Sequence, residues 1–468
     1  MAGGILDGLN GAQREAVTHD AGPLLIVAGA GTGKTTVITR RIAYLIEQGK
    51  ARPEEILALT FTDKAAAEME ARVDELVPYG YADVEIATFH AFGDALLRGH
   101  SLEIGLQNDF RVLSRAEQVI FLRDRLFDLP LQRYRPLGDP TRYLQSLITL
   151  FSRCKDEDIS ANAYLACAAR LGADADDEEK LDRAEAQAEL AATYARYQEM
   201  MARNDKIDFG DQIVQALRLL RARPHVLNAY QRRFKYVLVD EFQDTNYAQF
   251  ELVKMLAARH GNVAVTGDDD QAIYRFRGAA ISNVLSFLRH YPDARQIVVT
   301  ENFRSHQAIL DAAYTLIQYN NPDRLEVESG IVKRLTAVRE APGPLPRHWH
   351  YDTATQEADS VAQTIRERVE VGEWSYDDVA ILVRSNDDAD AFLRALNLRG
   401  VPWTFSGNAG LYGRPEVRIR CRSSTSRAAR RMRTASIAGC STFSRTPSRS
   451  PNSAVSCRKK RAGRSATS

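Results

Sequence analysis

A glycine-rich stretch at residues 28–36, Ala-Gly-Ala-Gly-Thr-Gly-Lys-Thr-Thr, carries residue types that can bind a triphosphate. Its glycines let successive backbone N–H groups converge on phosphate oxygens at the start of a helix. Lys34 would reach the β- and γ-phosphates of ATP, and the Thr35 hydroxyl would ligate Mg²⁺. The alternative is a plain glycine turn, but Lys followed by Thr at this spacing has no packing purpose. The predicted nucleotide-contacting residues are Ala28, Gly29, Ala30, Gly31, Thr32, Gly33, Lys34, Thr35 and Thr36.

Two adjacent carboxylates, Asp240 and Glu241, follow the apolar run at residues 236–239. Asp240 would join Thr35 in holding Mg²⁺, directly or through water. Glu241 would orient and deprotonate the water that attacks the γ-phosphate. The alternative is a strand end with two solvated acids, and the glycine-rich loop elsewhere in the chain favours the catalytic interpretation.

A third apolar run ends in Val-Thr-Gly-Asp-Asp-Asp-Gln, which would place the Gln271 amide at the γ-phosphate. The segment that follows alternates aromatic rings with arginines. Aromatic rings offer stacking platforms to unpaired bases, and arginines contact phosphates. Tyr274, Phe276 and Arg277 are therefore candidates for binding single-stranded DNA. Core packing with a solvated edge is the alternative.

The elements that must position these residues are short apolar strands separated by helical patterns. The expected strands lie at residues 24–28, 56–60, 84–88, 236–239 and 262–266. Continuous apolar strands alternating with helices predict an α/β fold with a parallel sheet and with ligands at the carboxyl ends of the strands. The interval from 88 to 236 is too long for a simple crossover, so residues 93–204 are expected to form a helical insertion.

A second alternation follows, with expected strands at 296–300, 347–351, 379–383 and 402–405. After residue 417 the composition changes to Arg, Ser, Thr, Ala and Cys, with 14 basic and no acidic residues, and this tail is expected to be disordered. Residues 1–417 then hold 48 basic and 61 acidic residues, a net charge of −13. Nucleic acid would have to bind to a local basic groove.

Five cysteines without metal-ligand spacing suit a reducing compartment. The sequence has no signal-peptide pattern and no apolar run of transmembrane length, so a cytoplasmic protein is expected.

Several ordered motifs resemble the UvrD/Rep/PcrA group of superfamily 1 DNA helicases over residues 5–417. The motifs include Ala58-Leu-Thr-Phe-Thr-Asp-Lys-Ala-Ala-Ala-Glu-Met69, Ala87-Thr-Phe-His-Ala-Phe92, Ile207-Asp-Phe-Gly-Asp211, Val239-Asp-Glu-Phe-Gln-Asp-Thr-Asn246 and Thr300-Glu-Asn-Phe-Arg-Ser305. This resemblance implies a P-loop NTPase with two RecA-like domains, ATP between them, and ATP-driven 3′-to-5′ movement on single-stranded DNA. The implied cofactors are ATP and Mg²⁺, and the implied partners are single-stranded DNA and junctions of single- and double-stranded DNA.

The resemblance also implies roles for individual residues. Gln13 and Arg40 would contact the nucleotide, Phe303 would stack on adenine, and Arg304 would reach the γ-phosphate. The implied DNA path is lined by Phe61, Thr88, His90 and Phe209 together with Tyr274 and Phe276. Taken alone, Gln13 is typical of a solvated helix residue and His90 of a core histidine.

The implied domains are residues 1–92 with 205–282 for the first RecA-like domain, 93–204 for the insertion, 283–417 for an incomplete second domain, and 418–468 for a basic tail. A frameshift after codon 417 would explain the tail. Three alternatives stay open: an inactive ATP- and DNA-binding fragment, a helicase subunit of a recombination helicase–nuclease, and a tail that acts as a nucleic-acid arm.

Overall fold

The computed structural model describes residues 4–77, 83–272, 282–341 and 343–405 of the 468-residue chain. The chain divides into two compact units, Met1–Pro346 and Arg347–Ser468. None of the helices in the described ranges combines the length and the apolar character needed to cross a bilayer.

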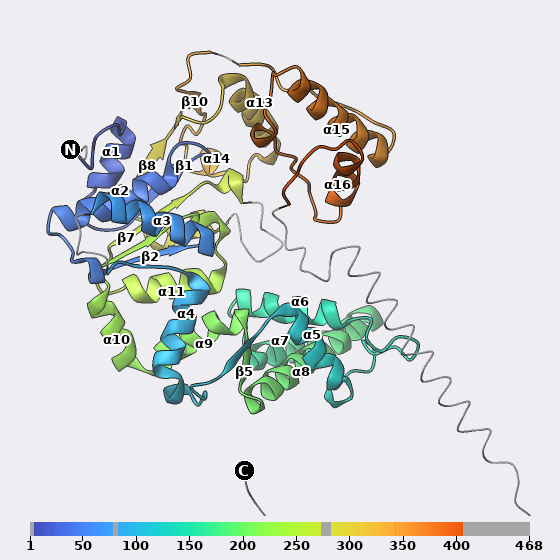
Figure 1. Ribbon diagram of the computed structural model, residues 1–468. Helices are drawn as coiled ribbons and strands as arrows, with labels where there is room; N and C mark the ends of the chain where they lie inside the picture. Colours follow the sequence, from blue (N-terminus) through green and yellow to red (C-terminus); the bar gives the residue numbers. More distant parts are fainter. Residues whose placement is uncertain (1–3, 78–82, 273–281, 342, 406–468) are drawn as a thin grey trace, which may run out of the picture. The chain divides into compact units, whose positions relative to one another are not determined.

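Six parallel strands form the central sheet of the first unit, in the order β3-β2-β6-β7-β1-β8 (Figure 1). The strands are β1 (Leu24–Ala28), β2 (Ile56–Thr60), β3 (Glu85–Thr88), β6 (Tyr236–Val239), β7 (Val263–Gly267) and β8 (Arg295–Val299). Every residue of β1, β2, β6 and β7 is buried. This burial explains the apolar runs and confirms the predicted α/β fold with a parallel sheet.

Helices cover both faces of this sheet. They include α1 (Gly11–Thr18), α2 (Lys34–Glu47), α3 (Asp63–Leu76), α4 (Phe89–His100), α9 (Phe209–Ala222), α10 (Pro224–Arg233), α11 (Tyr247–Ala257) and α12 (Ser282–His290). Side chains of β1 alternate between the two cores: Leu24 and Ile26 pack with α1, α2 and α3, whereas Leu25 and Val27 pack with α4, α9 and α11. Period-two alternation is how one buried strand contributes to both cores.

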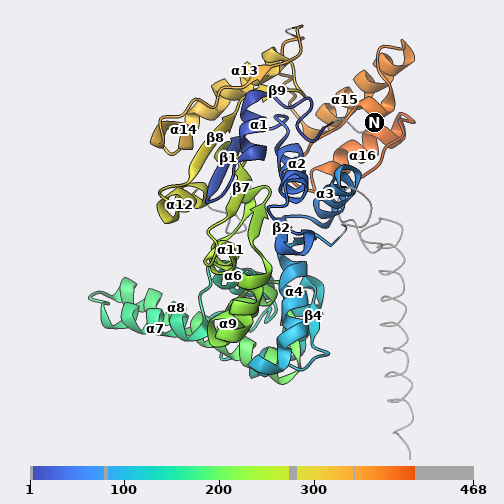
Figure 2. The ribbon, with the colours of Figure 1, turned by 90° about the vertical axis from the view of Figure 1, so that its left-hand side faces the viewer.

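The long interval between β3 and β6 contains a helical region with its own core. Its elements are β4 (Arg111–Leu113), α5 (Arg115–Asp124), α6 (Leu144–Asp156), α7 (Ala161–Ala173), α8 (Glu178–Arg203) and β5 (Lys206–Asp208). Side chains of α5, α6 and α8 form a separate apolar cluster that includes Phe121, Phe151 and Tyr197. Figure 2 shows α7 and α8 extending away from the central sheet.

The rest of the first unit follows β8. It contains β9 (Glu301–Asn302), which pairs in parallel with β10 (Thr336–Ala337), and the helices α13 (Gln307–Ile317) and α14 (Leu325–Glu328). The strand expected at 296–300 is present as β8, but it extends the first sheet beside β1, with Leu24 opposite Arg295. Burial of Ile297 and Val299 in the same core as α1 and α2 accounts for this placement.

The second unit, described to residue 405, contains α15 (Ala354–Glu370) and α16 (Ala389–Leu398) around a small apolar core. The strands expected at 347–351, 379–383 and 402–405 are not formed. Val379 and Ile381 instead pack against the helix core. The apolar run that predicted a strand is therefore packed on helices through these two side chains.

Candidate nucleotide-binding site

The predicted chemistry-bearing residues follow three neighbouring strands. The glycine-rich loop follows β1, Asp240 and Glu241 follow β6, and Gln271 follows β7 within a short 3₁₀ turn, Asp269–Gln271. These strands lie side by side in the order β6-β7-β1. Parallel strands end at the same edge of a sheet, so their polar ends meet.

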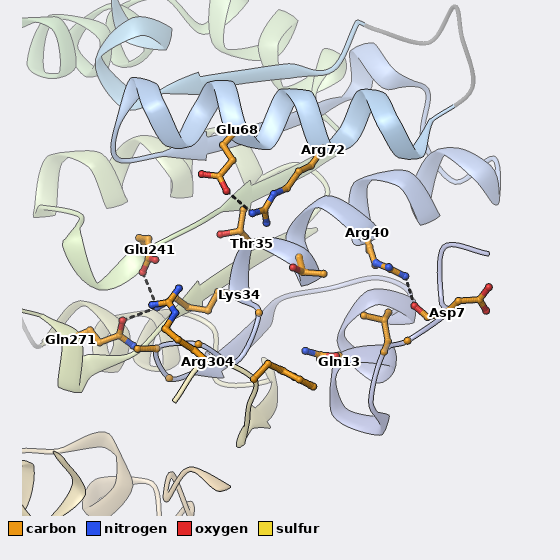
Figure 3. A pocket seen from close by; sticks show the side chains of 18 residues that line it. Asp7, Gln13, Lys34, Thr35, Arg40, Glu68, Arg72, Glu241, Gln271 and Arg304 are labelled. Atoms are coloured by element: carbon orange, nitrogen blue, oxygen red, sulfur yellow. Dashed lines mark hydrogen bonds and ion pairs between the residues drawn. The ribbon is translucent and has the colours of Figure 1, made fainter. Parts of the chain in front are cut away.

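These strand ends border a cavity of about 620 Å³ (Figure 3). Thirteen of the residues predicted to contact the nucleotide or to act on it line this cavity: Gln13, Gly29, Ala30, Gly31, Gly33, Lys34, Thr35, Thr36, Arg40, Glu241, Gln271, Phe303 and Arg304. Ala28, Thr32 and Asp240 are buried behind the lining. Thr32 supports the loop, because its hydroxyl donates to the Gly29 carbonyl at 2.8 Å.

Lys34 is the charged centre of the cavity, with a side chain that is only 7% exposed. Its Nζ lies 3.0 Å from Glu241 Oε2 and donates to Gln271 Oε1 at 2.9 Å. Figure 3 shows these side chains converging from the three strand ends. A buried ammonium that faces acceptors on one side is suited to binding an anion such as a phosphate on the other.

The turn of the loop at Gly31 requires glycine. Its φ is +76°, and a Cβ there would lie 2.7 Å from the Cβ of Arg304. The segment that approaches is held in place because Asn302 Nδ2 donates to the Ala30 carbonyl at 2.5 Å and Phe303 N donates to the Gly31 carbonyl at 2.9 Å. The loop thus admits a close backbone neighbour that carries Phe303 and Arg304 to the cavity.

Asp240 is buried behind Thr35. Its Oδ2 accepts from the Thr35 hydroxyl at 3.0 Å, and its Oδ1 accepts from Thr266 at 2.5 Å. Burial raises the pKa of Asp240 above its usual value, against the two hydroxyl donors and Lys34, which favour the charged form. A hydroxyl and a carboxylate so paired are oxygen ligands of the kind that Mg²⁺ prefers, so these residues fit the predicted ion. Thr266, inside β7, was not predicted.

Glu241 has a left-handed backbone, with φ 51° and ψ 47°, which is uncommon for a residue other than glycine. Its Oε2 accepts from Gln243 Nε2 at 2.6 Å as well as facing Lys34. Uncommon backbone conformations of this kind concentrate at functional sites. The turn directs the carboxylate into the cavity while the neighbouring Asp240 stays buried.

Gln13 and Arg40, implied as nucleotide contacts, make protein contacts at the edge of the cavity. Gln13 belongs to the capping box of α1 with Asn10, and its Nε2 donates to the Thr32 carbonyl at 2.8 Å. Arg40 Nη1 donates to the carbonyls of Ile5 and Asp7, each at 2.6 Å. Both residues therefore hold the N-terminal segment against the phosphate loop and still line the cavity.

Three further charged residues of the cavity were not predicted: Asp7, Glu68 and Arg72. Arg72 and Glu68 form an ion pair one turn apart on α3, and the helix directs both toward the loop (Figure 3). A Glu and an Arg four residues apart are common on solvated helices, so this pair alone does not indicate a site. The one sequence signal for these residues was that their helix directly follows β2.

The residues predicted to bind DNA are partly described. His90 and Phe209 lie together, with ring centroids 6.0 Å apart in a T-shaped arrangement, and Phe209 is 52% exposed. Burial lowers the pKa of His90. Thr88 caps α4 by accepting from Ala91 N at 3.2 Å, and Phe61 is half-buried after β2. Tyr274, Phe276 and Arg277 lie outside the described residues.

Comparison with protein families gives two matches. The model described as the UvrD/REP helicase N-terminal domain matches residues 9–292, and the model described as the UvrD-like helicase C-terminal domain matches residues 297–419.

Comparison with individual proteins finds similar helicases in several bacteria. The chain is 39% identical over 424 residues to "ATP-dependent DNA helicase UvrD1" of Mycobacterium tuberculosis, with 88% of this chain and 52% of the relative covered. It is 36% identical over 418 residues to "ATP-dependent DNA helicase PcrA" of Bacillus subtilis and 35% identical over 417 residues to PcrA of Leuconostoc citreum, with the same coverage. The chain thus spans about half the length of these relatives.

Proposed function

This chain belongs to the UvrD/REP helicase family, and we propose that it binds ATP with Mg²⁺ and couples ATP hydrolysis to 3′-to-5′ movement on single-stranded DNA. The cavity after β1, β6 and β7 is the proposed ATP site. DNA repair or recombination is the proposed setting.

The proposed binding step uses backbone and charge together. Backbone N–H groups of the glycine-rich loop, at the positive end of α2, would receive phosphate oxygens. Lys34 would exchange its contacts with Glu241 and Gln271 for the β- and γ-phosphates. Thr35 and Asp240 would hold Mg²⁺, which when bound neutralises charge on those phosphates.

The proposed hydrolytic step uses Glu241 as the base. Once Lys34 turns to the phosphates, the Glu241 carboxylate is free to accept the proton of a water aligned with the γ-phosphate. Gln271 would orient that water or sense the γ-phosphate, and Arg304 would stabilise negative charge from the other side of the loop. Phe303, exposed and next to Arg304, would stack on adenine.

The DNA path is proposed to pass the exposed ring of Phe209 beside His90 and Phe61. Tyr274, Phe276 and Arg277 would continue it, since they follow Gln271 directly in the sequence. Such a connection would let the γ-phosphate contact of Gln271 alter the DNA contacts at the end of each cycle.

The observation that carries the proposal is the meeting of Lys34 with both Glu241 and Gln271 at 3.0 Å or less inside one cavity. Three segments far apart in the sequence thereby bring an anion-binding ammonium, a base and an amide to a single point. This combination matches the needs of phosphoryl transfer to water.

ATP turnover with and without single-stranded DNA tests the proposal. We expect the Lys34→Ala chain to lose at least about 100-fold in turnover, because a preorganised donor to the transferred phosphoryl group is removed. Lys50→Ala is the matched control, since Lys50 is a lysine near the surface that pairs with Asp20. Unchanged turnover in Lys34→Ala would refute the site.

The same assay distinguishes the proposed ATPase from the alternative of an inactive ATP- and DNA-binding protein. A chain that binds ATP and DNA but shows no Lys34-dependent turnover would be such a module. Directional movement is tested by displacement of a labelled block from either end of a single strand, and displacement from the 5′ end alone is the expected result for 3′-to-5′ movement.

A further inference from the structure

Three consecutive aspartates, Asp268, Asp269 and Asp270, follow β7 just before Gln271, and their carboxylate oxygens lie within 4.8 Å of one another. Lys333, from a segment more than 60 residues away in sequence, places its ammonium among them. Its Nζ lies 2.7 Å from Asp268 Oδ1 and 2.8 Å from Asp270 Oδ2, and it also pairs with Asp269. The lysine thus occupies the position that a cation would take.

Arg324 brings a second positive charge to this cluster and also pairs with Glu326. It is 3% exposed and binds Asp270 with two parallel hydrogen bonds of 2.7 Å. Burial alone would raise the pKa of Asp270, but Arg324 and Lys333 outweigh it and hold the pKa below its usual value. Burial alone would lower the pKa of Lys333, but the three aspartates raise it. Asp270 and Lys333 are therefore both held in their charged forms.

Asp268 links this cluster to the cavity. While its Oδ1 faces Lys333, its Oδ2 accepts from Gln271 Nε2 at 2.7 Å. Gln271 Oε1 then faces the other way and accepts from Lys34 Nζ at 2.9 Å. Because an amide donates only from its nitrogen and accepts only at its oxygen, this arrangement fixes which end of Gln271 enters the cavity.

We propose that Lys333 is a positioning residue for ATP hydrolysis, which acts through Asp268 to hold Gln271 with its Oε1 toward the cavity. The inference rests on the proposed ATPase function and assigns to Lys333 a role in it. An acceptor oxygen at this point can receive a hydrogen bond from the attacking water, whereas the amide nitrogen in its place could not. Correct orientation of the attacking group contributes directly to the rate.

The same segment also contacts the phosphate loop, which supports a shared role. Two residues after Lys333, the methyl groups of Leu335 pack so closely on Gly29 that a Cβ there would lie 2.9 Å from them. Thr336 N donates to the Thr300 carbonyl at 2.9 Å and fixes the end of the segment beside β9. One segment therefore supports both the phosphate loop and the turn that carries Gln271.

The test compares full-length chains that carry Lys333→Gln, Lys333→Arg and the control Arg334→Gln. Arg334 is the adjacent residue and forms an exposed pair with Asp311. We expect Lys333→Gln to lower kcat about 10-fold or more while KM for ATP changes less than about 3-fold, because orientation and not binding is lost. Lys333→Arg should recover most of the lost kcat, and Arg334→Gln should match the parent.

A second pair of variants shows whether Lys333 acts through Gln271. In a Gln271→Ala background, Lys333→Gln should cause no further loss of kcat, since the positioned group is gone. An additive loss there, or a Lys333→Gln chain that matches the parent, would overturn the inference. If Lys333→Gln fails to fold, Asp268→Asn, which keeps the lysine, should give the same fall in kcat, and parental kcat in that variant would equally overturn it.

The parent and Lys34→Ala chains separate this inference from the proposed function. A parent with no Lys34-dependent nucleotide binding or turnover refutes the proposed function and the inference with it. A parent with Lys34-dependent turnover that Lys333→Gln leaves intact refutes the inference alone.

Discussion

Glu241 is held in the cavity by two donors, Lys34 and the Gln243 amide, and by an uncommon left-handed backbone. These constraints place a carboxylate where the proposed hydrolysis needs a proton acceptor. The charge of this side chain can be removed by substitution without changing its shape. An amide of the same size can keep both hydrogen-bonding geometry and backbone, but it cannot accept a proton from water.

We therefore expect Glu241→Gln to lower ATP turnover by about 10²- to 10⁴-fold, the usual range for loss of a general base. Binding of ATP should be retained, because Lys34 and the glycine-rich loop are unchanged. Steady-state turnover and the Kd of a fluorescent ATP analogue measure the two effects. Glu178→Gln, at the exposed start of α8, is the control. Turnover within about twofold of the parent would exclude Glu241 as the base.

The ring of Phe209 is half exposed, although it begins a helix that buries most of its apolar side chains, including Ile213 and Leu217. Its N-cap, Asp208, and the capping-box partner Asp211 fix the start of α9, so the ring has a defined direction. Stacking of a base on such a ring contributes about 1–3 kcal/mol.

Phe209→Ala should accordingly weaken binding of single-stranded DNA by about 5- to 150-fold, the equivalent of that stacking energy. The control is Phe127→Ala, since Phe127 is also strongly exposed but lies in the helical region. Fluorescence anisotropy with a labelled oligonucleotide gives both affinities. Equal losses in the two variants would show that the effect is not specific to the proposed DNA path.

At the scale of elements, α6 of the helical region meets α11, the helix that follows β6 and the Asp240–Glu241 pair. Asn246, the N-cap of α11, donates to Asp156 Oδ1 at 2.8 Å. Burial raises the pKa of Asp156 to about 7, against this hydrogen bond and the charge of Arg153, while Glu157 and Asp208 add to the rise. The Asp156 carboxyl in this contact therefore changes its protonation state near neutral pH.

The sign of the pH effect follows from this raised pKa. The folded chain binds the Asp156 proton more tightly than the unfolded chain does. The stability that protonated Asp156 contributes to the fold is therefore lost as the pH rises from about 4 to about 7. Asp156→Asn keeps the acceptor and removes the charge. Its unfolding temperature should come closest to that of the parent at about pH 4, where this loss begins, and exceed it by about 2 °C or more at pH 8. Thermal unfolding at both pH values measures this effect, with the exposed Asp174→Asn as control. The prediction is contradicted if the unfolding temperatures of Asp156→Asn and the parent differ by the same amount at both pH values.

The strands show how far local pattern predicts an element. The runs at 24–28, 56–60 and 236–239 became strands with the same bounds, because only a doubly covered parallel sheet buries every residue of such a run. The run at 379–383 did not form a strand: Val379 and Ile381 pack on helices, and Leu382 is 94% exposed. Periodicity reports which side chains are buried but not whether a neighbouring strand is present.

The candidate site was also predicted only in part: its motif residues were predicted, but the residues that support them were not. Motif spacing predicted that Lys34, Glu241 and Gln271 belong together, and they meet in one cavity. The supporting contacts of Thr266 and Lys333 were not predicted, because a threonine inside a strand and a lysine in a loop carry no local signature. Likewise, Lys155 is fully buried between Asp208 and Asp211, an ion-pair network formed only when α6 packs against α9. Such partners are fixed by tertiary packing.

At the scale of the whole chain, charge is distributed unevenly. Residues 1–417 have a net charge of −13, whereas residues 418–468 contain 14 basic and no acidic residues. If the tail acts as a nucleic-acid arm, one of the alternatives left open by the sequence, the C-terminal segment supplies electrostatic attraction to DNA and the aromatic residues of the body supply stacking. The two contributions depend differently on salt, because only phosphate contacts release counterions.

Removal of residues 418–468 should therefore reduce the salt dependence of binding to single-stranded DNA more than it reduces affinity at high salt. Each lost phosphate contact lowers the slope of log K against log salt by about 0.7. We expect the slopes of the full chain and of residues 1–417 to differ clearly, and their affinities to converge above about 0.3 M salt, where the Debye length falls below about 6 Å. Phe209→Ala should shift affinity at every salt concentration and leave the slope unchanged. A full chain and a shortened chain with the same slope would show that the basic segment does not contact DNA, and the body alone would then have to supply a basic groove.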